Sequence, residues 1–425
     1  MFFLYGVLYS AALVFFLPRE FFKRAPEARQ VWLREKLGFL ETRPATGAFL
    51  VHAASVGEVA AAVPFVQALR GRGKEVVLSV ITDTGREMAM KRLPGVPVVY
   101  MPFDLPFSIK KTLGQLKPAC LCLVETEIWP NTVRIAWAQK IPVCMLNGRI
   151  SEKSFSGYKK ARLFMKRIFG MMRMVCVQDE VYAKRAAMLG AGENKIHITG
   201  NFKFDLPLSK ILPDTGPSAA ISAAIKKPQW LEKFQGTVIV AGSTHKGEEE
   251  LVISAFRRLE AVRPGLRLVL APRHPQRAPE AAALLEAAGL SYFRTSAPPS
   301  AQEIASSKAA LLDTVGELFS AYQAASAAVV GGSFIPHGGQ NPLEPAWWAV
   351  PVICGPHMGN FPFMARMTAS GGAFQTEKEG LYGILERLLD NKALSLEAGK
   401  RAREFCLAEA GAVKRTLDLM ERLLN

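Results

Sequence analysis

The sequence is poor in acidic residues and lacks the patterns of several large protein classes. Its 425 residues include 37 Asp and Glu against 53 Lys and Arg, which gives a formal net charge of +16. Such an excess predicts an anionic partner, whether a nucleic acid, a phosphorylated small molecule or an anionic membrane surface. No Gly-X-Y period, heptad array or repeat of roughly 20–50 residues is present, which excludes collagens, coiled coils and solenoids.

Cysteine is also scarce, and its spacing is uninformative for metal binding. The 6 Cys residues form no Cys-X-X-Cys pair, and several lie in apolar runs. This usage is typical of reduced, buried cysteine in the cytosol and not of a disulfide framework. The Gly-X-Gly-X-X-Gly fingerprint, the Walker A motif and an Asp-X-Asp pair are absent as well. The last absence argues against a divalent metal bound to a diphosphate.

One apolar segment lies at the start of the chain. Residues 2–17 carry no charge but fall just short of the ~20 residues that span a bilayer comfortably. Basic residues follow the run instead of preceding it, and Pro18-Arg19-Glu20 is no cleavage site, so a signal peptide is excluded. We expect a membrane anchor at 1–22 with the rest of the chain in the cytoplasm. A buried N-terminal core helix is the alternative.

The remainder alternates short apolar strands with helical patterns, which predicts α/β domains with parallel sheets covered on both faces. A segment rich in Pro, Ser and Asp interrupts this alternation, which then begins again. We therefore expect two Rossmann-like domains that face a central cleft, with ligands at the carboxyl ends of the strands. The expected parts are the anchor 1–22, an N-terminal domain 47–205, a linker 206–235, a C-terminal domain 236–400 and a C-terminal helix 401–425.

Three motifs of the first domain follow strands. Glu58, in His52–Glu58, is placed to act as a base or to cap a helix at its first turn. Glu125 and Glu127 follow the strand Ala119–Val124, and period-2 spacing puts both on one face; we favour function over a core role. Lys203, between two phenylalanines, is suited to hold an anion, or is a surface lysine.

The second domain contains a glycine-rich stretch at Gly331–Phe334 and Gly338–Glu344. Asn341 suits the N-cap of a helix, Pro342 its first position and Glu344 its third. Glycine-rich backbone before a helix N-terminus predicts a phosphate site, with Glu344 accepting hydrogen bonds from a ribose. Capping alone explains Asn341, Pro342 and Glu344 but not the two Gly-Gly pairs.

Residues 154–173 are basic and contain no acidic residue. On one helix, Lys159, Arg162 and Lys166 share a face, and Phe164, Ile168 and Met172 form another. This pattern predicts either an amphipathic helix at a membrane surface or a core helix with a solvated basic face.

Five motifs in this order resemble those of the 3-deoxy-D-manno-octulosonic acid (Kdo) transferases of lipopolysaccharide synthesis. The motifs are His52–Glu58, Glu125–Asn131, Gly200–Asp205, Ala271–His274 and Gly338–Glu344. The resemblance implies the glycosyltransferase B fold and transfer of Kdo from CMP-Kdo to a lipid A precursor, lipid IVA. It also implies no metal, no other cofactor and a place at the cytoplasmic face of the inner membrane. The anionic acceptor and anionic membrane lipid account for the basic charge without a nucleic acid.

The same resemblance implies roles for individual residues. Glu58 matches the proton acceptor, and Glu125 and Lys203 match positions that stabilise the transition state. The CMP-binding positions correspond to Pro272, Arg273, Gly316, Glu317, Leu318, Asn341, Pro342, Leu343 and Glu344. Gln340 stands where relatives often carry His, a change from which we expect little effect.

Two other functions are compatible with parts of the sequence. A nucleotide-sugar epimerase can share the fold but has no need of residues 2–17. A non-enzymatic, membrane-tethered lipid-binding protein explains the charge and the anchor, but not the carboxylates that follow the strands.

Overall fold

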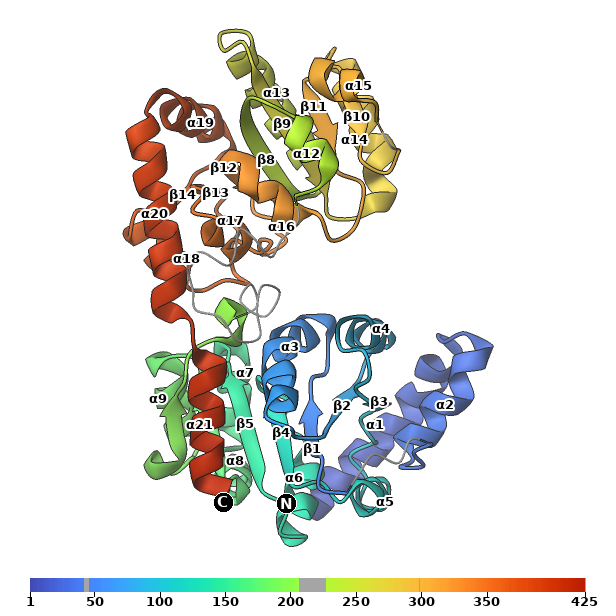
Figure 1. Cartoon of the computed structure of the whole chain (residues 1–425). Helices are drawn as coiled ribbons and strands as arrows, with labels where there is room; N and C mark the ends of the chain where they lie inside the picture. Colours follow the sequence, from blue (N-terminus) through green and yellow to red (C-terminus); the bar gives the residue numbers. More distant parts are fainter. Residues whose placement is uncertain (42–45, 206–226, 298, 425) are drawn as a thin grey trace. The chain divides into compact units, whose positions relative to one another are not determined.

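The computed structural model describes residues 1–41, 46–205, 227–297 and 299–424 (Figure 1). It divides into two compact units, each built on a parallel sheet of seven strands. The expected α/β class with two Rossmann-like sheets is thereby confirmed.

The sheet of the first unit has the order β3-β2-β1-β4-β5-β6-β7. Its strands are β1 (Phe49–His52), β2 (Val76–Val80), β3 (Val98–Tyr100), β4 (Cys120–Val124), β5 (Val143–Gly148), β6 (Met174–Val177) and β7 (Ile196–Ile198). The helices are α1 (Phe2–Phe22), α2 (Pro26–Lys36), α3 (Val56–Gly71), α4 (Asp83–Arg92), α5 (Pro106–Leu116), α6 (Pro130–Ala138), α7 (Glu152–Lys160), α8 (Arg162–Met171), α9 (Glu180–Met188) and α21 (Ala412–Leu424). Short 3₁₀ turns are η1 (Glu193–Lys195) and η2 (Phe202–Asp205). Strands such as β4 are buried along their whole length because helices cover both faces of the sheet.

The second unit repeats the architecture with the order β10-β11-β9-β8-β12-β13-β14. Its strands are β8 (Thr237–Thr244), β9 (Leu266–Pro272), β10 (Tyr292–Arg294), β11 (Ala309–Leu311), β12 (Ala325–Val330), β13 (Val352–Cys354) and β14 (Ala373–Gln375). The helices are α12 (Gln229–Lys233), α13 (Glu248–Glu260), α14 (Ala278–Ala287), α15 (Ala301–Ser306), α16 (Leu318–Ala321), α17 (Leu343–Trp347), α18 (Met364–Ala369), α19 (Leu381–Asp390) and α20 (Lys392–Glu409). Three 3₁₀ turns, η3 (Pro275–Arg277), η4 (Tyr322–Ala324) and η5 (Lys378–Gly380), complete it.

The end of the chain differs from the single helix expected at 401–425. It forms two helices, α20 and α21, and Gly411 between them has a φ of 88°. The carboxylate of Asp205 accepts the backbone N–H groups of Gly411 and Val413, each at 2.6 Å. The backbone N–H groups at the start of a helix have no acceptor within the helix, and Asp205 supplies one for α21. The helix α21 belongs to the first unit.

Two further expectations need adjustment. Residues 206–226 of the expected linker 206–235 lie outside the described residues. The last part of the expected linker belongs to the second unit, because Trp230, Leu231 and Phe234 pack into its core. The basic segment 154–173 is not one helix, because Ala161 leaves the helical conformation and separates α7 from α8. Met172, expected on the apolar face, is buried but follows the end of α8.

Candidate active site

Glu58 lies in the first turn of α3, at the carboxyl end of β1 in the first unit. Ser55 and Glu58 form a capping box: the Ser55 Oγ accepts the backbone N–H of Glu58 at 3.4 Å, and the Glu58 Oε2 accepts that of Ser55 at 2.9 Å. The helix-capping role is therefore present. Capping does not exclude a role as a base. Burial raises the pKa of Glu58 to about 7, and the Glu127 and Glu125 carboxylates act in the same direction. A carboxyl with this pKa is suited to accept a proton near neutral pH.

Glu125 and Glu127 follow β4 directly, in a turn at the same edge of the sheet. They are not on the strand itself, so the expected period-2 argument does not apply to them. Glu125 has a φ of 60°, a left-handed conformation that costs free energy for a residue other than glycine and that collects at functional sites. Burial raises the pKa of Glu127, the Glu125 carboxylate acts in the same direction, and a hydrogen bond from the Trp129 indole opposes both.

Lys203 reaches the same group of carboxylates from η2. Burial lowers the pKa of its ammonium, while the Glu125 and Glu58 carboxylates raise it. The buried side chains of Phe202 and Phe204 fix the turn on either side. Lys203 is half-buried and near enough to the Glu125 and Glu58 carboxylates for their charges to raise its pKa, so it is not a fully exposed surface lysine.

Sequence reasoning missed two residues at the end of β5, Asn147 within the strand and Arg149 directly after it. Asn147, with a φ of 54°, accepts the backbone N–H of Phe202 on its side-chain oxygen at 3.0 Å and so positions the turn that carries Lys203. The Arg149 guanidinium also lowers the pKa of Lys203, which places a second cation in the group. The rule that pointed to Glu125, namely that polar residues at the carboxyl end of a parallel strand line a site, also applies to Arg149.

In the second unit, the glycine-rich stretch is only partly available to a ligand. The buried carboxylate of Glu248 accepts the backbone N–H groups of Gly332, Ser333 and Phe334 at 2.6, 3.0 and 2.9 Å. The loop Gly331–Phe334 therefore contributes no phosphate site through these amides, contrary to our expectation.

Gly338–Glu344 remains as the candidate for binding a phosphate. Gly338 and Gly339 have φ values of 96° and 81°. The helix α17 begins at Leu343, one residue later than expected, and the Asn341 Oδ1 accepts the N–H of Leu343 at 3.2 Å. The N-cap is therefore Pro342 and not Asn341 as predicted, and Glu344 is the second residue of the helix instead of the third, although the Asn341 side chain still accepts a backbone N–H of the first turn.

The other predicted donor residues lie on loops of the same sheet. Pro272 ends β9, and the backbone N–H of Arg273 donates to the carbonyl of Thr244 at 2.9 Å. Gly316 has a φ of 103°, Thr314 donates to Glu317 at 2.6 Å, and Leu318 begins α16.

In this unit His245, His274 and His337 form a cluster, and none of the three was among the predicted site residues. The His245 ring lies 4.2 Å from that of His337 and 6.0 Å from that of His274. Gln340 is within 3.1 Å of the His245 Nε2, so this position contacts the cluster. Burial and neighbouring cations lower the pKa of His245 to about 4, so the ring is neutral at neutral pH. Within the described part of the chain, no group of three His, Cys, Asp or Glu residues could hold a metal ion.

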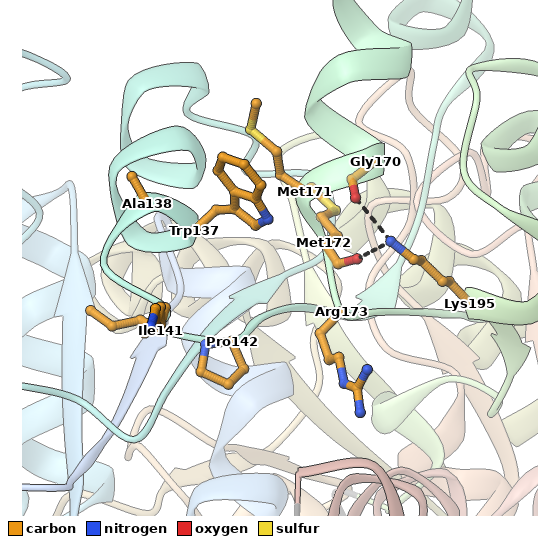
Figure 2. Close-up of a pocket in the computed structure, with 10 residues that line it drawn as sticks. Trp137, Ala138, Ile141, Pro142, Gly170, Met171, Met172, Arg173 and Lys195 are labelled. Atoms are coloured by element: carbon orange, nitrogen blue, oxygen red, sulfur yellow. Dashed lines mark hydrogen bonds between the residues drawn. The ribbon is translucent and has the colours of Figure 1, made fainter.

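A groove of about 580 Å³ lies at the opposite, amino edge of the first sheet (Figure 2). It is lined by Trp137, Pro142, Met171 and Arg173, and by Lys195, whose Nζ donates to the carbonyls of Gly170 and Met172. None of the predicted site residues lines it, so it is separate from the candidate active site.

Comparisons with known proteins show the family of the chain. Residues 32–206 match the family model described as 3-Deoxy-D-manno-octulosonic-acid transferase (kdotransferase). A 3-deoxy-D-manno-octulosonic acid transferase of Haemophilus influenzae is 34% identical over 412 residues, which cover 95% of this chain and 93% of the relative. One of Bordetella pertussis is 36% identical, covering 88% of this chain and 87% of the relative.

Solved structures of the same fold are more distant. A UDP-GlcNAc 2-epimerase from Neisseria meningitidis has a TM-score of 0.60 at 14% identity and covers 88% of this chain and 100% of its own. The MurG protein of Acinetobacter baumannii has a TM-score of 0.55 at 13% identity, with 89% and 100% covered. These similarities show a fold of the glycosyltransferase B type. The activity is inferred from the sequence relatives, which are more similar to this chain. By those relatives, the chain belongs to the Kdo transferase family, glycosyltransferases of lipopolysaccharide biosynthesis.

Proposed function

We propose that this protein transfers Kdo from CMP-Kdo to a hydroxyl of the lipid A precursor lipid IVA, with Glu58 as the general base. The observation that carries the proposal is the group formed by Glu58, Glu125 and Lys203 within the first unit, where burial raises the pKa of Glu58 to about 7. A base must remove the acceptor proton as the new glycosidic bond forms.

The chemistry is a displacement at the anomeric carbon of Kdo. The acceptor oxygen forms a bond to this carbon, the bond from the carbon to the CMP phosphate oxygen breaks, and CMP leaves with the electron pair. The hydroxyl proton passes to Glu58. Lys203 and Glu125 carry charges of opposite sign next to this position, and fixed charges of this kind stabilise the charge that develops in the transition state.

The second unit supplies the donor site in this proposal. Pro272, Arg273, Gly316, Glu317, Leu318 and Asn341–Glu344 are the residues assigned to CMP. The guanidinium of Arg273 is suited to the single phosphate of CMP-Kdo by a charge-assisted hydrogen bond, and the Glu344 carboxylate to ribose hydroxyls. A single phosphate carries less charge than a diphosphate, so we propose that these groups act without a metal or another cofactor.

We further propose that the protein lies on the cytoplasmic face of the inner membrane. Within the described residues, α1 is the helix long and apolar enough to cross a membrane. One face of α1 packs on the first unit through Phe2, Tyr9, Leu13, Leu17 and Phe21. The opposite face exposes Phe3, Val14 and Phe15 by 85%, 74% and 77%. Because one face is attached to the unit along its length, we propose that α1 lies in the membrane interface and does not span the bilayer.

The direct test mixes the protein with CMP-Kdo and lipid IVA. We expect release of CMP and a product heavier than lipid IVA by one or more Kdo residues in a mass spectrum. Release of CMP that does not depend on lipid IVA, with no heavier product, would refute the transferase assignment for this acceptor. Product mass after exhaustive reaction also gives the number of Kdo residues added.

A further inference from the structure

Glu58 and Glu127 are two carboxyl groups at the carboxyl edge of the first sheet, where they follow the adjacent strands β1 and β4. The charge of Glu127 contributes to the raised pKa of Glu58, after burial. Two carboxyls coupled in this way titrate as a pair, and the surroundings of each decide which one retains the proton. The inference rests on the proposed function, in which Glu58 is the base.

The surroundings of Glu127 include a histidine whose protonation state can be assigned. His52 ends β1 and is fully buried, beside Ser79 of β2. Its Nδ1 lies 3.0 Å from the Ser79 Oγ and 3.2 Å from the Ser79 carbonyl oxygen. Because a carbonyl oxygen only accepts, Nδ1 carries the ring proton. Burial lowers the pKa of His52 to about 3, and the Lys36 ammonium acts in the same direction, so the ring is neutral.

The other ring nitrogen of His52 therefore presents a lone pair. This Nε2 is buried, has no hydrogen-bond partner among the described residues, and lies 3.9 Å from the Glu127 Oε2. An ionised carboxylate cannot donate a hydrogen bond to it, whereas a protonated carboxyl can. The separation exceeds a direct hydrogen bond by about 1 Å, as is common for functional contacts before the substrate binds.

The surroundings of Glu58 favour the opposite state. Its Oε2 accepts the backbone N–H of Ser55 at 2.9 Å, a bond that requires an acceptor. It also lies in the first turn of α3, where the helix dipole stabilises a negative charge. One carboxyl thus faces an N–H donor and a helix N-terminus, and the other faces a lone pair.

We propose that Glu127 carries a proton, which it donates to the Nε2 of His52, and that this leaves Glu58 as the ionised carboxylate of the pair. Glu127 is then a positioning residue. Because it holds the proton of the pair, Glu58 stays ionised and can accept the proton of the acceptor hydroxyl.

The remaining charged and polar groups around the pair are compatible with this assignment. The Glu125 carboxylate and burial raise the pKa of Glu127, and Glu127 in turn contributes to a raised pKa of Tyr158 on α7. The Trp129 Nε1–H donates to the Glu127 Oε2 at 3.2 Å, which favours the charged form. It does not prevent protonation, because a carboxylic hydroxyl accepts one hydrogen bond while it donates another.

Infrared difference spectroscopy locates the proton without turnover. At a pH well above 7, where Glu58 with its pKa of about 7 is ionised, the full-length protein should show the C=O stretch of a protonated carboxyl that is lost in E127Q and retained in E58Q. A band that is lost in E58Q and retained in E127Q would place the proton on Glu58 and overturn the proposal. Loss of the band in neither variant would also overturn it, because Glu127 would then be ionised.

Kinetics provide a second readout that a purely structural role does not predict. E127A should lower kcat/KM roughly tenfold, the scale of one lost hydrogen bond. E127Q should restore most of this loss, because its amide donates to the Nε2 of His52, and the acidic limb of its pH profile should stay in place. A limb that moves to lower pH in E127Q would show that a negative charge had been removed, which contradicts a neutral Glu127.

These results are separable from a failure of the proposed function. If E58Q transfers Kdo normally, Glu58 is not the base, whatever the infrared spectra show about Glu127.

Discussion

The carboxyl edges of the two sheets hold carboxylates in opposite conditions, buried in the second unit and half-buried in the first. In the second unit, Glu248 accepts four backbone N–H groups, those of Gly332, Ser333, Phe334 and His245, at 2.6–3.0 Å. In the first unit, burial raises the pKa of both Glu58 and Glu127. Among the described residues no cation forms an ion pair with either, since the His52 ring near Glu127 is neutral.

The neighbouring Glu249 of the second unit is satisfied too, by Arg277 at 2.7 Å and Thr244 at 3.0 Å. The difference shows how one architecture serves two purposes. A buried carboxylate with a full set of donors fixes the loops around it, whereas one with few donors remains able to take up a proton.

Replacing the base of the first unit should have the largest effect. E58Q should reduce transfer by roughly 10²–10⁴-fold while CMP-Kdo binding stays nearly intact, because the amide cannot accept the proton. In the wild type, kcat/KM should fall as the pH drops below about 7, since the base must be ionised and its pKa is raised to about 7. Steady-state rates across pH and calorimetric titration with CMP-Kdo check both statements. Near-normal turnover of E58Q would refute the assignment.

Replacing the structural carboxylate of the second unit tests the other side of the comparison. E248A leaves several buried N–H groups without an acceptor, each worth about 1–3 kcal/mol, so the free energy of unfolding should fall by about 3 kcal/mol or more. Urea denaturation measures the loss. E280A is the matched control, because Glu280 pairs with Arg277 at an exposed position, where an ion pair contributes at most about 1 kcal/mol. Equal stability of the two variants would mean that the amides do not depend on Glu248.

The comparison also explains which features could be predicted from the sequence. Continuous apolar runs such as Cys120–Val124 predicted parallel strands, and strand ends predicted where polar residues gather, because parallel strands share a carboxyl edge. Strand ends thus predicted the edge at which Glu58 and Glu125 lie, while the joint role of these residues with Lys203 was implied by the resemblance to the Kdo transferases.

Contacts between distant parts of the chain could not be predicted in this way. Glu248 and Gly332 are 84 residues apart, and no local pattern marks the carboxylate that occupies the glycine-rich amides. The same holds for α21, which returns to the first unit and is capped there by Asp205. Local periodicity predicts an element and its buried face, but not the element on which that face packs.

The donor residues of the second unit should show smaller effects than Glu58. R273A should weaken CMP-Kdo binding by roughly 10–100-fold, the range for a lost hydrogen bond between charged groups. E344A should also weaken it, through the ribose. R257A, at an exposed position of α13, is the matched control and should bind normally. Unchanged affinity in both R273A and E344A would place the nucleotide elsewhere.

The smallest expected effects concern the membrane side of the first unit. Lys159, Arg162 and Lys166 are exposed on α7 and α8, and Phe164 of α8 contacts Phe2 of α1 with a ring separation of 5.0 Å. The basic side chains are therefore next to the proposed membrane-facing helix. A Lys or Arg near an anionic membrane contributes about 1 kcal/mol, so each change to Gln should weaken vesicle binding roughly fivefold.

Salt should reproduce this loss, because it screens exposed charges. The matched variant F3S/F15S changes only the exposed face of α1, leaves its packed face intact, and should reduce binding at every salt concentration, since burial of apolar surface does not depend on screening. Sedimentation with anionic and with neutral vesicles measures both effects. In one possible result, the variant with Lys159, Arg162 and Lys166 all changed to Gln binds anionic vesicles as the wild type does, while F3S/F15S does not. The basic face of α7 and α8 is then only solvated, and α1 alone attaches the protein to the membrane. Transfer to a water-soluble acceptor fragment should survive in both variants, because none of the changed residues is among the proposed catalytic or donor-binding residues.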